Sequence, residues 1–265
     1  MNPDTRDPAG AGDEMSSAAV PAGLPAAAAI HRRVLASGVA LDLLVVPTDR
    51  GAGSSDASMT DMTGLLRDWV SATAGAALAV VVPLYDCLVA WAPGRAAIVG
   101  PPEHLASLET AIIAFAAQDA SLRDAERRGT AILDAIDADV AASTEPESWS
   151  REQQRGLTSR YHEAVTIGCR LSLLSSAIHA PPIHPPTLVT QLGERLRDRT
   201  RLVERHELAT ERAALAERVS EASRQRALEL SVARQQIGLE WVIVVLLVVQ
   251  TALLVVDMLA SRGAT

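Results

Sequence analysis

The chain has 265 residues and a mass of 27.9 kDa, which is enough for one sizeable domain or two small ones with a buried core. Hydrophobic residues make up 48% of it and aromatic residues only 3%, a composition that excludes collagen-like and wholly disordered chains. The formal net charge of -8 argues against a nucleic-acid binder that acts through a general positive field. Cys87 and Cys169 are too few for a disulfide framework, and we expect both to be buried thiols.

Residues 1–26 hold acidic residues, Pro, Gly and Ala without any periodic apolar pattern, so we expect a disordered tail. A secretory signal needs a basic start and a strongly apolar run. Here an acidic start is followed only by the alanines of 26–29. We therefore expect the N-terminus to stay in the compartment where the chain is made.

Residues 27–140 are predicted to form an α+β domain. The β-branched run 39–46 ends at a proline and precedes a helical stretch near 60–70. Three short apolar segments follow with turn residues between them, at 79–82, 87–91 and 95–99. Such short links favour antiparallel pairing. A helix that opens at Pro102 and runs to about residue 118, and a second helix to about 139, would complete a small, mostly antiparallel sheet with helices.

The loop Gly51–Ser55 lies between the first expected strand and helix, where backbone amides could hold a phosphate. No Gly-Lys-Ser/Thr follows it, and Asp56 stands where a dinucleotide fingerprint has its third glycine. The preferred interpretation is a connecting loop.

Two further groups of residues could bind a metal ion. Asp134, Asp137 and Asp139 lack a calcium-loop glycine and nearby ligands, so they are interpreted as a solvated helix face. His179 and His184 bracket a proline-rich segment without an evident third ligand, so they are interpreted as loop residues. We expect no catalytic site, no cofactor and no metal.

Residues 141–186 are predicted to form a helix over 150–178 and a Pro-rich link, so that the helices make a hairpin. Residues 187–240 contain no proline and are predicted to form one long amphipathic, coiled-coil-like helix. Its expected apolar stripe, interrupted by Arg226, consists of Leu215, Val219, Ala222, Leu230, Ala233, Ile237 and Trp241. Arg and acidic residues nearly balance along this helix, which favours a solvated flank over a nucleic-acid contact.

Residues 241–260 are predicted to form a transmembrane helix at the end of the long C-terminal helix. Trp241–Val256 has no charged side chain and is apolar on every face, although it would span only about 24 Å of a hydrocarbon core of ~30 Å. The alternative is a buried core helix. The membrane-anchor residues are Trp241, Val242, Ile243, Leu246, Leu247, Gln250, Leu253 and Leu254. Gln250 near the midpoint predicts a hydrogen-bonding partner helix.

Arginines are more frequent before this segment than after it, at positions 224, 226 and 234 against 262. This distribution predicts a tail-anchored, single-pass cell-membrane protein whose N-terminal bulk is cytoplasmic. Its expected partners are membrane lipid and, through the C-terminal helix, a second copy or another membrane protein. Contact with nucleic acid is expected only indirectly, through ribosomes.

Three short motifs resemble a known family: Trp149-Ser150-Arg151-Glu152, Ile167-Gly168-Cys169-Arg170, and Leu239-Glu240-Trp241 before an Ile/Val/Leu-rich segment. They are similar to the required-for-meiotic-nuclear-division family, whose YagE-like domain of unknown function occurs in bacteria, fungi and mitochondria. The resemblance covers roughly residues 30–260. Its signature positions are Trp149, Arg170, Leu239, Glu240 and Trp241.

The chain departs from that family at two places. Asp86 follows Tyr85 where the family usually has a glycine, and Gln250 stands where its last apolar segment usually has an acidic residue. The resemblance implies a membrane-anchored scaffold without established catalytic activity, and the mitochondrial member implies support of translation at a membrane.

Three functions are consistent with these patterns. The preferred one is a tail-anchored, non-enzymatic scaffold or interaction protein that presents a cytoplasmic α+β domain, in support of translation or assembly at the membrane. The alternative is a membrane-associated enzyme or nucleotide-sensing module that uses the loop Gly51–Ser55. The third is a membrane-tethered ribosome or RNA binder, which the charge balance of 191–240 disfavours.

Overall fold

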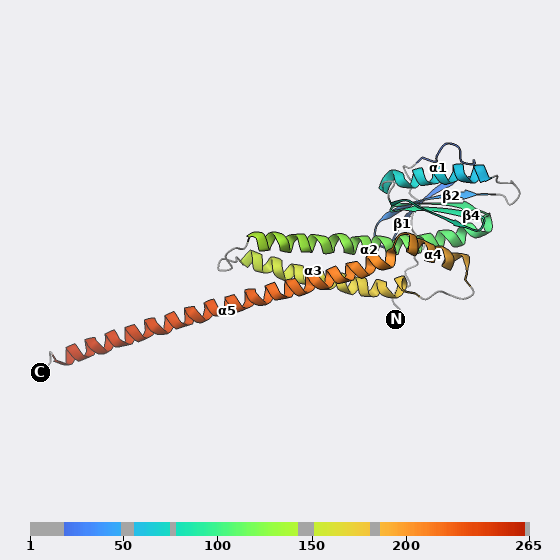
Figure 1. Cartoon of the computed structure of the whole chain (residues 1–265). Helices are drawn as coiled ribbons and strands as arrows, with labels where there is room; N and C mark the ends of the chain where they lie inside the picture. The colour runs from blue at the N-terminus through green and yellow to red at the C-terminus, as the bar shows by residue number, and fades with distance from the viewer. Residues whose placement is uncertain (1–18, 49–55, 75–77, 143–150, 181–185, 263–265) are drawn as a thin grey trace, which may run out of the picture. The chain divides into compact units, whose positions relative to one another are not determined.

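The computed structural model describes residues 19–48, 56–74, 78–142, 151–180 and 186–262 (Figure 1). The chain divides into two compact units. Unit 1 comprises residues 1–129 and 167–212, and unit 2 comprises residues 130–166 and 213–265.

Unit 1 contains a five-stranded sheet in the order β1-β2-β5-β4-β3. The strands are β1 (Ala29–Val34), β2 (Ala40–Pro47), β3 (Val80–Leu84), β4 (Cys87–Ala92) and β5 (Arg95–Gly100). The predicted antiparallel pairing of the last three is confirmed. β2 pairs in parallel with β5, so the sheet is mixed. β1 is an additional edge strand that was not predicted from the sequence. It contains two arginines and a histidine, so it lacks the apolar pattern that indicates a buried strand.

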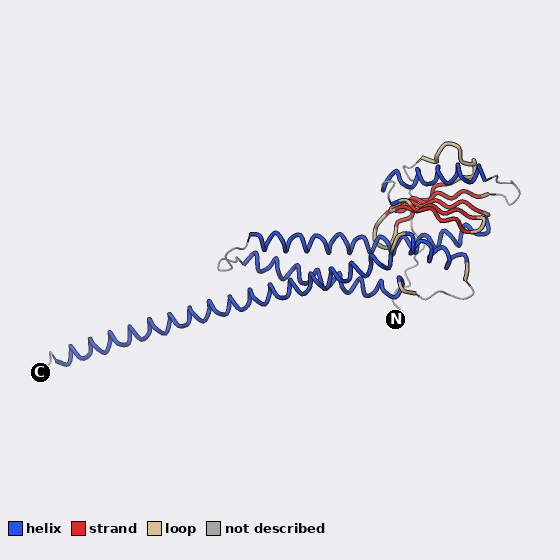
Figure 2. Tube along the Cα trace, viewed as in Figure 1, coloured by secondary structure: helices blue, strands red, loops and turns tan. Residues whose placement is uncertain are grey.

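Both faces of this sheet are covered. Helix α1 (Asp56–Ala74) packs on one face, where Leu44, Leu66 and Val70 are fully buried in a single apolar cluster. The opposite face packs against α2, since the Trp91 ring of β4 meets Phe115 edge-on at 5.1 Å. Figure 2 shows the strands between these helices. Every residue of β4 is therefore buried.

The helices differ from the predicted ones in length and in number. The helix α2 (Pro102–Ala142) is continuous where the sequence predicts two helices, and α3 (Arg151–Ile178) follows. The predicted single helix over 187–240 is wrong. It is divided into α4 (Leu188–Arg199) and the start of α5 (Leu202–Arg262).

The break between α4 and α5 lies at Thr200 and Arg201. Arg201 has a φ of 50°, a left-handed conformation that ends the helix. The Thr200 hydroxyl donates to the carbonyl of Leu196, and the side chains of Leu196 and Leu202 on either side of the break are both buried. A bend lets both leucines reach the apolar interior, which a straight amphipathic helix with this spacing does not allow.

Unit 2 contains the last part of α2, the first part of α3 and α5 from Ala213 onward. Ile132, Ile136 and Leu157 are buried there. On α5 the buried positions are small residues, Ala213, Ala216 and Ser220, and Leu215 of the predicted stripe is exposed.

Within the described part of the chain, no helix is both long enough and apolar enough to cross a membrane. The transmembrane helix predicted over 241–260 is therefore wrong. The tail-anchored, single-pass cell-membrane location with cytoplasmic bulk falls with it. The charge-free run between Glu240 and Asp257 covers only about 24 Å, which is shorter than a hydrocarbon core of ~30 Å. The predicted α+β class is confirmed, but the predicted membrane-spanning segment of the C-terminal helix is not.

Candidate functional sites

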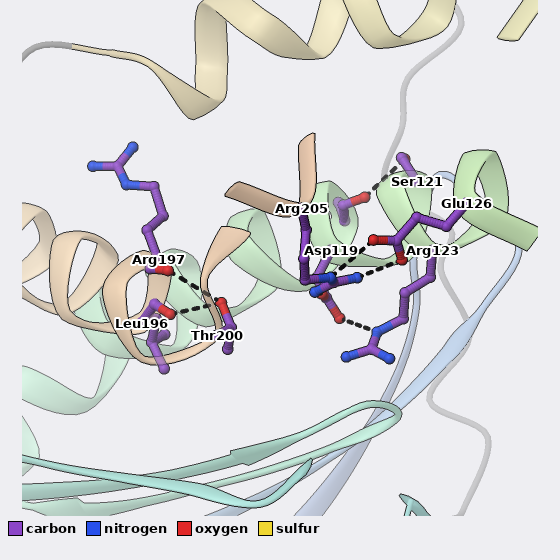
Figure 3. A network of polar contacts seen from close by, with 9 residues as sticks. Asp119, Ser121, Arg123, Glu126, Leu196, Arg197, Thr200 and Arg205 are labelled. Carbon is purple, nitrogen blue, oxygen red and sulfur yellow. Dashed lines mark hydrogen bonds and ion pairs between the residues drawn. The ribbon is translucent and has the colours of Figure 1, made fainter. Parts of the chain in front are cut away.

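A buried acidic residue organises the α2 side of unit 1. Asp119 of α2 is only 1% exposed, a burial that a carboxylate tolerates when both oxygens are paired. One oxygen accepts a hydrogen bond from Arg205 Nη1 at 2.8 Å, and the other accepts from Arg123 Nε at 2.7 Å (Figure 3). Asp119 therefore ties α5 to α2.

Glu126 lies two helical turns after Asp119 and extends this network. Its two oxygens accept hydrogen bonds from Arg205 Nε at 2.9 Å and from Arg205 Nη2 at 2.8 Å, a bidentate arrangement (Figure 3). Burial by itself would lower the pKa of Arg205. The hydrogen bonds to Glu126 and Asp119 outweigh burial, so the pKa of Arg205 is raised and its positive charge is secured.

A cavity of about 420 Å³ lies beside this network, between α2 and the turns of the sheet. Its lining residues are Leu35, Val39, Ala40, Leu41, Trp91, Pro93, Gly94, Ala116, Asp119, Ala120, Arg123, Glu126 and Arg127. The β4–β5 turn reaches it through Gly94, whose φ of 83° suits a glycine. Most of the wall is apolar, and the polar groups come chiefly from one face of α2.

A buried histidine joins α5 to α3 in the same unit. His206 Nε2 lies 2.9 Å from the carbonyl oxygen of Leu171, and its ring packs edge-on against His179 at 5.4 Å. His179 follows the end of α3, as expected for a loop residue. Among the described residues, no group of His, Cys, Asp and Glu could hold a metal ion.

Three of the predicted site regions lie outside the described residues: the loop Gly51–Ser55, Trp149 and His184. Asp134 and Asp137 are exposed, as expected for a solvated face, and the side chain of Asp139 is not described.

The two cysteines differ from each other. Cys87 is buried, as predicted, whereas the prediction of a buried thiol is wrong for Cys169, which is exposed. Burial and then the charges of Asp86 and Glu103 raise the pKa of the Cys87 thiol, which disfavours its reactive thiolate.

The remaining signature residues lie apart from the cavity. Arg170 is exposed and forms an ion pair with Asp124 of α2 at 3.7 Å, so it contributes to helix packing in unit 1. Leu239, Glu240 and Trp241 are all exposed on α5 in unit 2.

The C-terminal part of α5 exposes large apolar side chains in an unbroken run, including the expected anchor residues Trp241, Val242, Ile243, Leu246, Leu247 and Leu253. Gln250 is exposed, and the side chain of Leu254 is not described. The Thr251 hydroxyl donates to the carbonyl of Leu247 at 2.8 Å, which satisfies it within the helix.

A heptad pattern runs along this part of α5. Exposed residues follow each other at alternating spacings of four and three, and we call them the apolar seam: Leu228, Val232, Gln235, Leu239, Val242, Leu246, Val249 and Leu253. Such a repeat is typical of a coiled-coil contact. It lies on different residues from the stripe predicted from the sequence, of which Leu230, Ala233 and Ile237 have side chains that are not described.

Sequence reasoning missed the residues around the cavity. The spacing of Asp119, Arg123 and Glu126 shows that they share a helix face, but Arg205 and Trp91 come from distant segments that no local pattern connects to them.

Comparison of the chain with protein families, curated proteins and solved structures finds no match. The resemblance to the required-for-meiotic-nuclear-division family therefore stays a prediction.

Proposed function

We propose that this chain is a non-enzymatic assembly protein that self-associates through the apolar seam of α5 and thereby holds several copies of unit 1 in one oligomer. The observation that carries the proposal is the seam itself, a heptad stripe of exposed apolar residues on a continuous helix. Monomeric proteins seldom expose a contiguous apolar surface of this kind.

Burial of this seam against other copies supplies the driving force. Fully burying a leucine or valine side chain stabilises by about 1.5–3 kcal/mol, so a half-exposed seam residue gains roughly 1 kcal/mol per copy. Leu246 and Val249, for example, are 61% and 50% exposed. Seven apolar seam positions together can exceed the cost of association, which starts at about 4 kcal/mol.

The seam favours an oligomer larger than a dimer. Its last two heptads alternate leucine, at 239, 246 and 253, with the β-branched Val242 and Val249. Leucine at position a with β-branched isoleucine at position d shifts coiled coils toward trimers and tetramers, and valine is the related β-branched residue here. Ile243, Val244 and Leu247 beside the seam are also exposed, and a two-stranded contact would leave them in water.

Gln235 is the polar position within the seam. A buried polar residue in a coiled coil fixes register and orientation, because it is satisfied only opposite a hydrogen-bonding partner. In a parallel, in-register bundle, each Gln235 meets the Gln235 of its neighbours, so their amides can pair. This arrangement gives all copies of α5 the same direction and register.

The test is the oligomeric state of the full chain by light scattering across a range of protein concentrations. We expect a tetramer, and we expect Leu246→Glu to raise the concentration needed for assembly roughly tenfold or more. Leu173→Glu is the matched control, since Leu173 is an exposed leucine of α3 outside the seam, and it should leave assembly unchanged. A monomeric wild-type chain, or one held by phospholipid vesicles and not by its own copies, would overturn the proposal.

A further inference from the structure

We propose that the cavity beside Asp119 is a binding site for a small organic acid, a molecule with one carboxylate on an apolar body. Its volume of about 420 Å³ lies within the range of roughly 300–1,000 Å³ that is typical of small-molecule pockets. Every lining residue belongs to unit 1, and the site is independent of the seam on α5.

Arg123 provides the group that would bind the carboxylate. Its Nε donates to Asp119 at 2.7 Å, which fixes the plane of the guanidinium. Among the described contacts its two terminal nitrogens donate to no protein group, and Figure 3 shows them turned away from the carboxylate of Asp119. An arginine held in this way presents a planar pair of donors that matches a carboxylate.

Trp91 provides a second donor in the wall of the cavity. The side chain is only 2% exposed, and its buried Nε1 has no hydrogen-bond partner in the described part of the chain. A buried donor left unpaired costs about 1–3 kcal/mol, so natural proteins rarely retain one without a ligand or water to satisfy it. An acceptor oxygen on a bound molecule would satisfy this N–H.

The carboxylates of the site argue for an anion and against a cation. Each oxygen of Asp119 and of Glu126 already accepts a hydrogen bond from an arginine, so the negative charge of the two carboxylates is balanced by Arg123 and Arg205 and gives little attraction for a cation. Leu35, Val39 and Leu41 form an apolar wall that suits a hydrocarbon or aromatic body.

The test measures binding of a defined panel to the full chain by calorimetry and by ligand-observed NMR. The panel contains linear monocarboxylates of four to eight carbons, phenylacetate, the methyl ester of each acid, and inorganic phosphate. We expect at least one acid to bind, with its ester roughly tenfold weaker or more because the ester cannot form the charge-assisted pair with Arg123. Binding of phosphate alone, or equal binding of acid and ester, would overturn the proposal.

Three variants locate the binding. Arg123→Gln should weaken the acid roughly tenfold or more, and Arg67→Gln, which removes an exposed charge on the opposite side of the sheet, should change nothing. Val39→Trp fills the rim of the cavity without touching the Asp119 network and should abolish binding. Circular dichroism checks the fold of each variant. Unchanged affinity in both Arg123→Gln and Val39→Trp would place the acid elsewhere and refute the site.

Discussion

The sheet of unit 1 and the C-terminal part of α5 consist of the same residue types in opposite environments. Leu44 of β2 is 0% exposed between the sheet and α1, whereas Leu246 of α5 is 61% exposed. Both lie in runs of Val, Leu and Ile. Apolar composition therefore predicts that a segment favours burial, but it does not predict which surface buries it. Unit 1 buries its apolar side chains within the chain, whereas the C-terminal part of α5 leaves them exposed.

Replacement of the same residue type in the two regions gives the largest contrast. Leu44→Ala should lower the free energy of unfolding of unit 1 by about 3 kcal/mol, because it removes a fully buried side chain and leaves a cavity. Leu246→Ala should leave the stability of unit 1 unchanged and weaken assembly. Urea unfolding followed by circular dichroism measures the first effect, and light scattering measures the second.

Protein concentration separates these two effects. The loss in Leu44→Ala should be the same at every concentration, whereas the effect of Leu246→Ala should depend on it, as for any change in an association equilibrium. If Leu246→Ala lowered the free energy of unfolding by several kcal/mol at every protein concentration, the apolar seam would already be buried within a single chain. That result would contradict the contrast between Leu44 and Leu246.

Local apolar patterns predict the central strands but not the sheet's edge or its order. The runs at 79–82, 87–91 and 95–99 become β3, β4 and β5, since short links between β-branched segments leave few alternatives to antiparallel pairing. β1 could not be found in this way, because its charged residues lie on a partly exposed edge. The parallel pairing of β2 with β5 depends on a crossover that includes α1, which no local signal contains.

The candidate sites were even less accessible to sequence reasoning. Asp119 and Arg205 meet across 86 residues, and no local pattern distinguishes this buried aspartate from the partly exposed Asp124 five residues later. In α5 the apolar character was evident and its interpretation was wrong, because an all-round apolar helix can be covered by copies of itself as well as by lipid. Within the part of the chain that the structure describes, no helix is long and apolar enough to cross a membrane.

A smaller effect on the free energy of unfolding is expected when a carboxylate charge is removed inside the buried Asp119 network of unit 1 or next to it. Asp119→Asn keeps the shape of the side chain but removes the charged acceptor of Arg123 Nε and of Arg205 Nη1, while Arg205 keeps its bidentate pair with Glu126. It should destabilise unit 1 by about 2–3 kcal/mol. Asp124→Asn removes a carboxylate that is 40% exposed and pairs at 3.1–3.7 Å, so its cost should stay below about 1 kcal/mol. Equal losses in urea unfolding would show that burial does not strengthen this network.

The smallest effect concerns an ion pair of unit 2 and depends on pH. A hydrogen bond from Arg224 lowers the pKa of Glu221 below its ordinary value of 4.5, and the Arg224 guanidinium also lies 5.2 Å from the centre of the Tyr161 ring. Because the pKa of Glu221 is lower in the folded chain than in the unfolded one, the pair stabilises above pH 4.5 and loses this contribution as the pH falls through the folded-state pKa.

Glu221→Gln should therefore lower the unfolding temperature slightly at neutral pH and leave it unchanged well below the pKa of Glu221, where the wild-type carboxyl is protonated as well. Salt should reduce the difference at neutral pH, because the pair is partly exposed to solvent. Glu217→Gln, one turn earlier on α5, removes the same charge away from Arg224 and serves as the control. A difference between wild type and Glu221→Gln that persists at acidic pH would mean that the side chain acts through packing and not through its charge.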